Sequence, residues 1–394
     1  MSDFAHPGHA AYYLVRAATT APSLHNTQPW LFVGEEQDRG LELHADTSRQ
    51  LPLTDPYGRE LVISCGAALF TLRLAMRRLG FAPRVACLPR PRDPAFLARV
   101  GWGVCAAPTA DEALMFAALP RRHTVRGPLR PDPLPVPLIR ALREQAHAEG
   151  AALRVLAGPD EHRLANIVRA AEHVHRTTPG HTAELAQWSW PSGQRRLDGI
   201  PDDACAFHPD CTPFALRDYT RLTRDVLPPL WHDAPRTGLV CVLTTAHDNR
   251  LDWLRAGQAL QRVLLYAAAH QVMAAFPTQP LEQPRLRARV RAGIAGGRAP
   301  QVILRLGYAP RLGRLPRRPP PRRSRPPGHG PATKPDPRIS GQLRLSYLAC
   351  RCLAMIPYTE SMAGGDTDAS CDTAGSPCSL DHHSCGDRRS PDRV

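Results

Sequence analysis

Two helical segments about 190 residues apart repeat one pattern, and this repeat constrains the fold more than any other feature of the chain. The segments are "CGAALFTLRLAMRRLGFAP" (65–83) and "AGQALQRVLLYAAAHQVMAAFP" (256–277). Each contains Gly-x-Ala-Leu and ends at an Ala-Pro or Phe-Pro pair, with Gly66 and Gly257 in equivalent positions. The repeat predicts two related α+β halves that pack as a pseudo-dimer within one polypeptide.

Each half is predicted to combine helices with strands. In residues 1–116, helices are expected at 10–19 and from 58 to about Gly80, a residue that suits a helix end. Alternating or apolar runs predict strands at 30–33, 41–46, 83–88 and 97–104. In residues 117–320, helices are expected at 138–153 and from 253 to a turn that reaches Pro280, and strands at 238–246 and 299–310.

Two stretches differ in composition from these halves. Residues 175–233 are polar, rich in proline and carry Trp188, Trp190 and Trp231, which suggests a lid, a wrapping arm or disorder. Residues 321–394 begin with an Arg/Pro-rich run and contain few apolar residues, so this tail is predicted to be mostly disordered. Its cysteines match no paired Cys-x-x-Cys spacing, and no metal site is predicted.

The charge and hydropathy of the chain exclude several function classes. The formal net charge is +14, but the basic residues are scattered arginines with a single lysine, Lys334, and no aromatic stacking pattern accompanies them. Binding to nucleic acid is therefore not expected. No apolar run reaches the roughly 18 residues of a membrane helix, and no signal peptide is visible. The dispersed cysteines of the body are typical of a reducing compartment, so a cytoplasmic protein is expected.

Two polar motifs are candidates for a binding site. In "APSLHNTQPW" (21–30), a polar loop lies between apolar anchors, so that it either caps secondary structure or holds a ligand. In "RRHTVR" (121–126), Arg122, Thr124 and Arg126 alternate and would face one way in an extended segment. Such a face can present charge-assisted donors to a phosphate, although a solvated charge run in an exposed turn remains the alternative.

Seven stretches in order make the chain resemble the nitroreductase superfamily, and specifically the fused, Acg-like family of FMN-binding nitroreductase-like proteins of actinobacteria. They are "APSLHNTQPWLF", "DPYGRELVISCGAAL", "RRHTVRGPL", "WLRAGQALQRVLL", "TQPLE", "PQVILRLGYAP" and "LPRRPP", and they lie within residues 10–320. The resemblance implies a nitroreductase-like α+β fold, with helices flanking central, mostly antiparallel sheets.

The resemblance also implies where a flavin would bind. Ordinary nitroreductases are homodimers with two FMN sites, each built from an arginine arm and a Pro-Ser-x-x-Asn loop. Here the first half has only the loop and the second half only the arm, which implies one composite site per chain and a monomer. The implied cofactor-binding residues are Pro22, Ser23, His25, Asn26, Arg122, His123, Thr124, Arg126, Thr278, Gln279, Pro280, Leu281, Arg317 and Arg318.

Roles for these residues follow from the same resemblance. Arg122, Arg317 and Arg318 would hold the FMN phosphate, and Arg126 would lie near flavin N1. The turn 276–281 would offer a backbone N–H to N5, although Thr278 stands where asparagine is expected. The implied activity is hydride transfer from NAD(P)H through the flavin to a nitroaromatic, quinone or similar small-molecule acceptor, with no catalytic side chain. The alternative is a flavin-binding or flavin-sequestering stress protein with little turnover.

Overall fold

The computed structural model describes residues 9–35, 39–127, 129–191, 196–201, 204, 214, 217, 219, 238–309 and 315–320. Contacts between residues divide the chain after Pro335, and every described residue lies in the first of the two units. The tail at 321–394, with its cysteines, and most of residues 202–237 lie outside the described residues, so the expectations made for them stay predictions.

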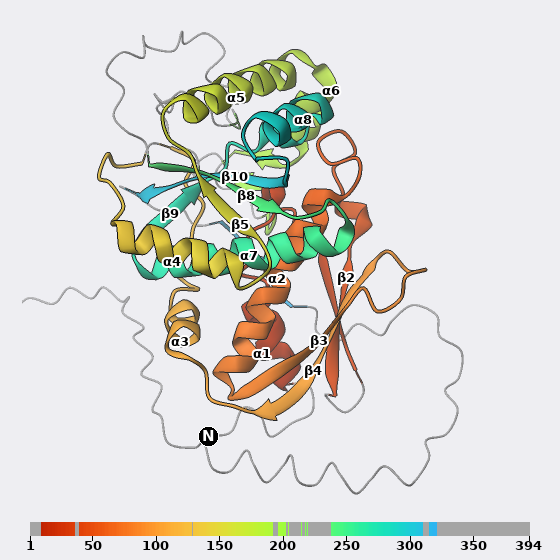
Figure 1. Cartoon of the computed structure of the whole chain (residues 1–394). Coiled ribbons are helices and arrows are strands. Elements are labelled where there is room, and N and C mark those ends of the chain that lie inside the picture. The colour runs from red at the N-terminus through yellow and green to blue at the C-terminus, as the bar shows by residue number, and fades with distance from the viewer. Residues whose placement is uncertain are drawn as a thin grey trace, which may run out of the picture. The chain divides into compact units, whose positions relative to one another are not determined.

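The first half is built on a four-stranded antiparallel sheet (Figure 1). Its strands, in the order β1-β2-β4-β3, are β1 (Trp30–Gly34), β2 (Gly40–Ala45), β3 (Phe81–Cys87) and β4 (Phe96–Cys105). Burial alternates along β2, where Leu41 and Leu43 face the core and the residues between them are less buried. Helix α1 (His9–Ala18) packs on helix α2 (Arg59–Arg78), and α2 packs on the sheet.

The second half repeats this arrangement. Its sheet has the order β5-β8-β10-β9, also antiparallel, and consists of β5 (Ala152–Val155), β8 (Leu239–Thr245), β9 (Val272–Ala275) and β10 (Ala299–Tyr308). Helix α4 (Val136–His147) precedes β5, and helix α7 (Arg250–Ala269) joins β8 to β9 just as α2 joins β2 to β3. Helix α3 (Ala110–Ala117) connects the halves. The two halves therefore share one strand order around one long helix.

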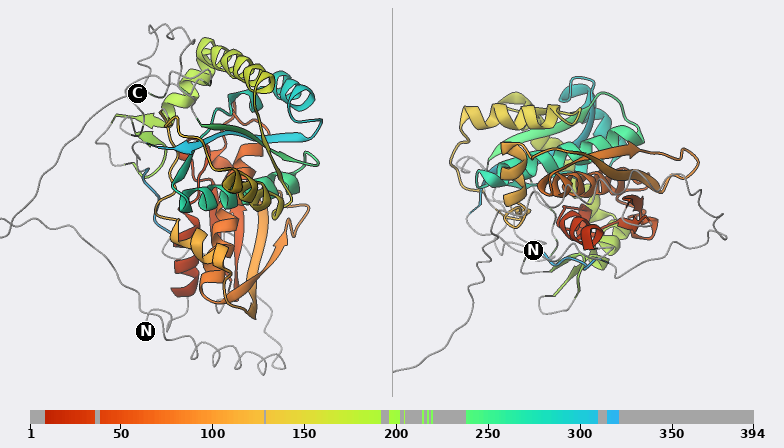
Figure 2. Two further views of the ribbon diagram at one scale, coloured as in Figure 1. Left: turned by 60° about the vertical axis from the view of Figure 1, so that its left-hand side comes forward. Right: turned by 90° about the horizontal axis from the view of Figure 1, so that it is seen from below.

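The two long helices form the centre of the molecule, with one sheet on each side of the pair (Figures 1 and 2). They cross where Gly66 of α2 faces Gly257 of α7. A Cβ atom on either glycine would collide with the carbonyl oxygen of Leu254 or Ile63 on the other helix. Glycine at both positions lets the backbones approach this closely, which explains the shared Gly-x-Ala-Leu pattern.

The structure corrects three secondary-structure expectations. The helix expected from 253 towards Pro280 ends at Ala269, because Gln271 adopts a left-handed conformation (φ 62°) that ends the helix and starts β9. The helix expected at 138–153 ends at His147, and a turn with Gly150 at φ 79° leads into β5. The stretch from 175 contains helix α6 (Pro179–Gln187) and the short strands β6 (Ser189–Trp190) and β7 (Ile200–Pro201).

Helices α5 (Pro159–Thr177) and α8 (Pro284–Gly293) complete the second half.

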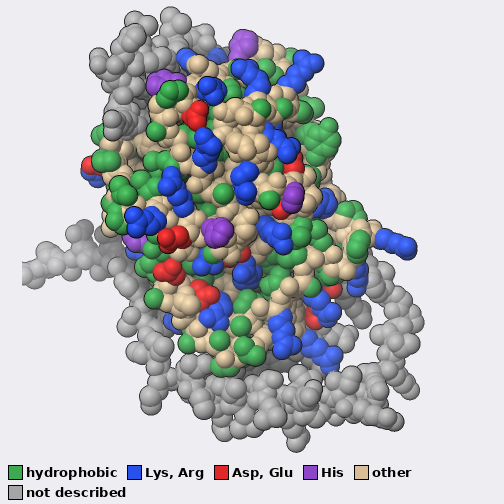
Figure 3. Space-filling view, in the orientation of Figure 1, with side chains coloured by type: hydrophobic (Ala, Val, Ile, Leu, Met, Phe, Trp, Pro, Cys, Tyr) green, Lys and Arg blue, Asp and Glu red, His purple; other side chains and the backbone are tan. Residues whose placement is uncertain are grey.

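The surface shows arginines interspersed with other side chains rather than gathered in one patch on the face in view (Figure 3). Among the described helices, none combines the length and apolar character needed to cross a bilayer. The described residues also contain no group of three or more His, Cys, Asp or Glu side chains placed to hold a metal ion. Of the described cysteines, Cys65 and Cys241 are buried as small apolar residues, whereas Cys105 is exposed.

Candidate functional site

A cavity lies where the two halves meet, and its empty space, including the part that is open to solvent, is about 850 Å³. The first half contributes the 22–25 loop and the first turns of α2, and the second half contributes the arginine arm, α7, the end of β9 and β10. Two residues of the 175–233 stretch, Arg217 and Tyr219, also line it. The lining residues are Pro22, Ser23, Leu24, His25, Glu60, Ile63, Ser64, Thr124, Val125, Arg126, Arg217, Tyr219, Leu260, Phe276, Thr278, Gln301 and Val302.

The polar loop at one wall of this cavity has an unusual backbone. His25, Asn26 and Gln28 all have positive φ angles, of 47°, 56° and 51°. The Ser23 hydroxyl accepts a hydrogen bond from the Gln28 amide at 2.9 Å, which closes the loop on itself. Non-glycine residues in this conformation cost free energy and persist only where the surroundings hold them.

Segments distant in sequence hold this loop. The Asn26 side chain donates to the carbonyl oxygens of Gly199 (2.9 Å) and Pro316 (3.2 Å), and its Oδ1 accepts from Arg317 Nη1 at 2.7 Å. The Gln28 side chain accepts from the Arg318 amide at 2.9 Å. Asn26 thus positions Arg317, and its amide is already engaged by protein partners.

Three guanidinium groups, those of Arg122, Arg126 and Arg317, form what we call the arginine cluster. Arg122 is 6% exposed, and burial, with repulsion from Arg317 and Arg126, lowers its pKa to about 9. Burial and Arg126 lower the pKa of Arg317 to about 10. Among the described residues, no carboxylate forms an ion pair with any member of the cluster. Buried like charges without a counter-ion are costly, so the cluster is suited to receive an anion.

Three other residues that were expected to bind the cofactor, Arg318, His123 and Thr124, lie outside the arginine cluster. The Arg318 side chain has a pKa lowered by burial and by Arg49, with Asp46 and Asp198 opposing this shift, so it belongs to a different charge group from the cluster. His123 is half-buried and does not line the cavity, whereas Thr124 does, and Thr124 pairs with Ala274 at the edge of β9. This pairing makes the arm extended at Thr124, the conformation that was assumed when its alternating residues were expected to face one way.

The turn after β9 contributes one lining side chain from the expected set. Thr278 lines the cavity, and Gln279, Pro280 and Leu281 form a buried turn of 3-10 helix behind it. The Gln279 side chain donates to Glu172 at 3.1 Å, and the Leu281 carbonyl accepts from Arg59 at 3.4 Å. The turn is therefore anchored on both sides, by α5 and by α2.

His25 and Tyr219 meet at the cavity wall. The His25 Nδ1 atom lies 3.0 Å from the Tyr219 hydroxyl, and the rings pack edge to face. Burial, followed by the charges of Arg217 and Arg126, holds the pKa of His25 well below its usual range, so its ring is neutral at pH 7. The Arg126 guanidinium lies 5.7 Å from the centre of the Tyr219 ring. A neutral His25 acts here as a hydrogen-bonding group and not as a proton donor.

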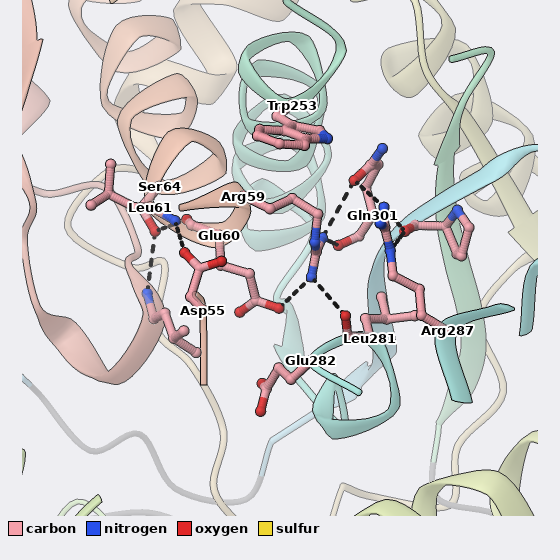
Figure 4. Close-up of polar contacts among 12 residues, drawn as sticks. Asp55, Arg59, Glu60, Leu61, Ser64, Trp253, Leu281, Glu282, Arg287 and Gln301 are labelled. Atoms are coloured by element: carbon pink, nitrogen blue, oxygen red, sulfur yellow. Dashed lines mark hydrogen bonds and ion pairs between the residues drawn. The ribbon is translucent and has the colours of Figure 1, made fainter. Parts of the chain in front are cut away.

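A buried acidic and basic network lies below the cavity (Figure 4). Arg59 donates to the Glu60 carboxylate at 2.6 Å and to the Gln301 carbonyl at 2.7 Å. Asp55 accepts from the Leu61 amide at 2.8 Å and so caps the first turn of α2. Glu60, which lines the cavity, projects from that capped turn.

A second cavity lies at the matching place on the other side of the helix pair. Counting from the two glycines, Glu60 and Ser64 of the first cavity correspond to Leu251 and Arg255, and both of these line the second. Glu149 pairs there with Arg73 at 2.7 Å and with Arg262 at 3.1 Å. The second cavity thus contains its own counter-ions. The arginine cluster has none among the described residues, and of its three members Arg126 alone lines the first cavity.

Comparison with known proteins decides the family. No family model matches the chain. A Mycobacterium tuberculosis protein that carries the provisional name NAD(P)H nitroreductase is 36% identical over 298 residues, which cover 74% of this chain and 83% of that protein. The chain belongs to the nitroreductase family. A second M. tuberculosis protein, provisionally named NAD(P)H nitroreductase acg, is 31% identical over 301 residues, or 76% of this chain and 88% of that protein. The resemblance to Acg-like nitroreductases is thereby confirmed.

Solved structures of nitroreductases are also similar to the chain. The FMN-dependent nitroreductase NfnB from Mycobacterium smegmatis, in complex with NADPH, is 19% identical, with a TM-score of 0.33 over 52% of this chain and 95% of that one. A nitroreductase with bound FMN from Bacteroides fragilis is 12% identical, with a TM-score of 0.31 over 56% of this chain and 98% of that one.

Sequence reasoning did not find several residues of this nitroreductase's cavity. Glu60 and Ser64 were part of a recognised stretch, but no role was expected for them. A charged residue at the start of an otherwise apolar helix was the available signal for Glu60. Arg217 and Tyr219 had no local signal, because the long polar stretch around them shows no periodicity.

Proposed function

We propose that the chain binds FMN in the first cavity and acts as an NAD(P)H-dependent oxidoreductase of the nitroreductase type. The observation that carries this proposal is the arginine cluster, where Arg122, Arg126 and Arg317 lie together without a carboxylate among the described residues. A dianionic phosphate would supply the missing counter-charge. The names of the M. tuberculosis relatives and of the FMN-bound nitroreductase structures support the same cofactor and donor.

The residues present fit the two ends of FMN. Arg122 and Arg317 do not line the cavity, but they belong to the same cluster as Arg126, which does, and we propose that they hold the phosphate. Ile63, Leu260 and Val302 offer an apolar surface for the ring system. Ser23, Thr124 and Thr278 line the cavity with hydroxyl groups that suit the ribityl chain or the ring edge. We place Pro22 and His25 at the same wall, and Gln279, Pro280 and Leu281 in the turn that supports Thr278. Asn26, His123 and Arg318 would act from behind the wall rather than on the cofactor.

Bound FMN would supply reversible hydride transfer at N5, between NAD(P)H and a nitroaromatic, quinone or similar acceptor. The protein itself would bind the cofactor, orient it and polarise it. Arg126 faces the cavity, and a fixed cation there favours any negative charge that develops beside it. His25 would hold Tyr219 against the same wall and so restrict access of water.

We infer that residues 1–116 and 117–320 are related halves and that together they build one cofactor site per chain. The shared strand order and the Gly66–Gly257 crossing support this relation. The Arg73–Glu149–Arg262 pairs support a second cavity that takes no flavin. A monomer with one FMN, acting in the cytoplasm on a small molecule and not on nucleic acid, is the assembly we propose.

A flavin-sequestering protein with little turnover is the second candidate. Its specific support is that the 175–233 stretch reaches the cavity: Tyr219 contacts His25, Gly199 is bonded to Asn26, and Leu197 accepts from Gln28 at 2.7 Å. A lid held by this many contacts would slow the exchange of nicotinamide and acceptor.

Two measurements test these proposals. Flavin released from the purified protein, set against its mass by light scattering, should give about one FMN per monomer. Two FMN per chain, or FMN in dimers only, contradicts the composite site. Stopped-flow bleaching of the bound flavin by NADPH then separates the candidates, because a sequestering protein would bleach slowly or not at all.

A further inference from the structure

The charges in the buried network below the first cavity do not balance. Three carboxyl groups lie there, those of Asp55, Glu60 and Glu282, all less than 9% exposed. Two guanidinium groups face them: Arg59 donates to Glu60 at 2.6 Å, and Arg217 donates to Glu282. Among the residues that the structure describes, one carboxyl group therefore has no positive partner. An unmatched buried carboxylate is costly, so one proton remains in the network at neutral pH.

The other charged groups around the network do not change this count. Arg287 is matched by Asp248, which accepts two hydrogen bonds from it at 2.7 and 2.8 Å. Glu172 is only half-buried and interacts with Gln279. Burial, followed by the charge of Arg217, lowers the pKa of His175 to about 3, so this histidine adds no positive charge.

Glu60 and Glu282 are the two carboxyl groups of the network that are best suited to hold that proton. Burial raises the pKa of Glu60, against the opposing effect of Arg59. Burial also raises the pKa of Glu282 well above its usual range, although Arg217 opposes it, and the charge of Glu60 raises it further. Burial raises the pKa of Asp55 too. Asp55 is nevertheless less suited to hold the proton, because its carboxylate caps α2 by accepting from the Leu61 amide.

The two glutamates differ in what they face. Glu60 lines the first cavity, whereas the side chain of Glu282 is fully buried behind it. Glu282 Oε2 lies 3.6 Å from His175 Nε2, and neither atom has a hydrogen-bond partner in the described part of the chain. The His175 ring stacks on His181, which is only partly buried, with 4.7 Å between ring centres. The pair thus has one end at the cavity and the other directed towards the surface.

We propose that Glu60 is the proton donor to the electron acceptor in the first cavity, with Glu282 as the second carboxyl group that shares the proton with it. This rests on the proposed function. When a quinone is reduced, it gains a hydride from the reduced cofactor, which is thereby oxidised, and a proton from the Glu60 carboxyl group, whose O–H bond breaks as a quinone oxygen gains the hydrogen. The Glu60 carboxylate is then reprotonated through Glu282 from solvent.

The first test uses FMN-free protein and infrared spectroscopy. The wild type should show the carbonyl stretch of one protonated carboxylic acid at neutral pH. Glu60→Gln and Glu282→Gln, which imitate the protonated acid in shape, should each remove this band, because the remaining two carboxylates are then balanced by Arg59 and Arg217. Glu184→Gln is the matched control: Glu184 is equally buried but accepts from two backbone amides at 2.9 Å, and its loss should leave the band in place.

The second test uses FMN-loaded protein and two acceptors. 1,4-Benzoquinone needs a proton as it is reduced, whereas ferricyanide takes one electron and no proton. In Glu60→Gln, the rate of flavin reoxidation by benzoquinone relative to ferricyanide should fall about 100-fold, at the lower end of what general acid catalysis contributes.

Several results would overturn the proposal. A band that persists in Glu60→Gln shows that the proton is elsewhere, and an unchanged ratio of the two rates shows that Glu60 does not donate it. A wild type that binds FMN and lacks the band refutes this inference alone. A wild type that binds no FMN refutes the proposed function, and the proton donor with it, even if the infrared band is present.

Discussion

Replacing Arg122 by alanine should weaken FMN binding roughly 10- to 100-fold. The substitution removes one charge-assisted hydrogen bond to the phosphate, worth about 1.5–3 kcal/mol, and each 1.4 kcal/mol corresponds to about a tenfold change in Kd. Two features of the site keep the loss within this range. Arg317 remains to hold the phosphate, and Arg126 still contributes its positive charge to the cluster.

The assay is a fluorescence titration of flavin-free protein with FMN at pH 7, and the chain offers a matched control. Arg121 is the exposed neighbour of Arg122, so Arg121→Ala removes the same charge from the same segment without touching the cluster. Riboflavin, which lacks the phosphate, should bind the wild type and Arg122→Ala with similar affinity. Equal FMN affinities for the two alanine variants, or an equal loss for riboflavin, would refute the phosphate assignment.

Four further predictions concern the same molecule. Arg126→Ala should lower the flavin midpoint potential while weakening FMN binding less than Arg122→Ala does; a potential that stays constant in a redox titration contradicts its place beside the ring. The pKa of Arg122 is lowered to about 9 in the folded protein, so above about pH 9 the unfolded chain binds more protons than the folded chain. The stability of the flavin-free wild type relative to Arg122→Ala should therefore rise between about pH 8 and about pH 10, which thermal melts of both proteins measure. Gly257→Ala should cost about 1–3 kcal/mol of unfolding free energy by overpacking the helix crossing, which a denaturant titration measures; a neutral effect means that the helices separate easily. Deletion of residues 321–394, with Arg317 retained, should leave the melting temperature and flavin content unchanged, and a large loss would show that the tail packs on the body.

The sequence predicted the parts of the fold that depend on local pattern. The two helices expected in the first half and the strands at 30–33, 41–46, 83–88, 97–104, 238–246 and 299–310 agree with the structure, because their apolar periodicity reflects burial on one face. In the second half, the helices expected at 138–153 and from 253 were predicted too long, and α5 and α8 were not predicted. Strand β9 was missed because its four residues continue the alanine-rich composition of α7, and only the left-handed Gln271 separates them. A backbone conformation of this kind in a non-glycine residue leaves no clear sequence signal.

For the candidate site, the sequence pointed to the polar loop and the arginine arm but not to the buried network of acidic and basic side chains. The Pro22–Asn26 loop and the Arg122–Arg126 arm could be found because each is a continuous segment with a known resemblance. Glu60 and Glu282 lie more than 200 residues apart in the chain, and burial raises the pKa of each against the charges of Arg59 and Arg217. Such coupling depends on tertiary packing, which no single segment records.

The presence of both halves on one polypeptide changes how the two cavities can diverge. In an assembly of identical subunits, every substitution appears on both sides of the axis, so a change that damages one pocket damages both. Here Leu251 can differ from Glu60, and Arg255 from Ser64, because each codon affects one side alone. If the two halves are related, as we propose, selection could keep one pocket for the cofactor while the other becomes a set of ion pairs that joins α2, α7 and the end of α4. The covalent link would then keep the two unlike halves together at any protein concentration.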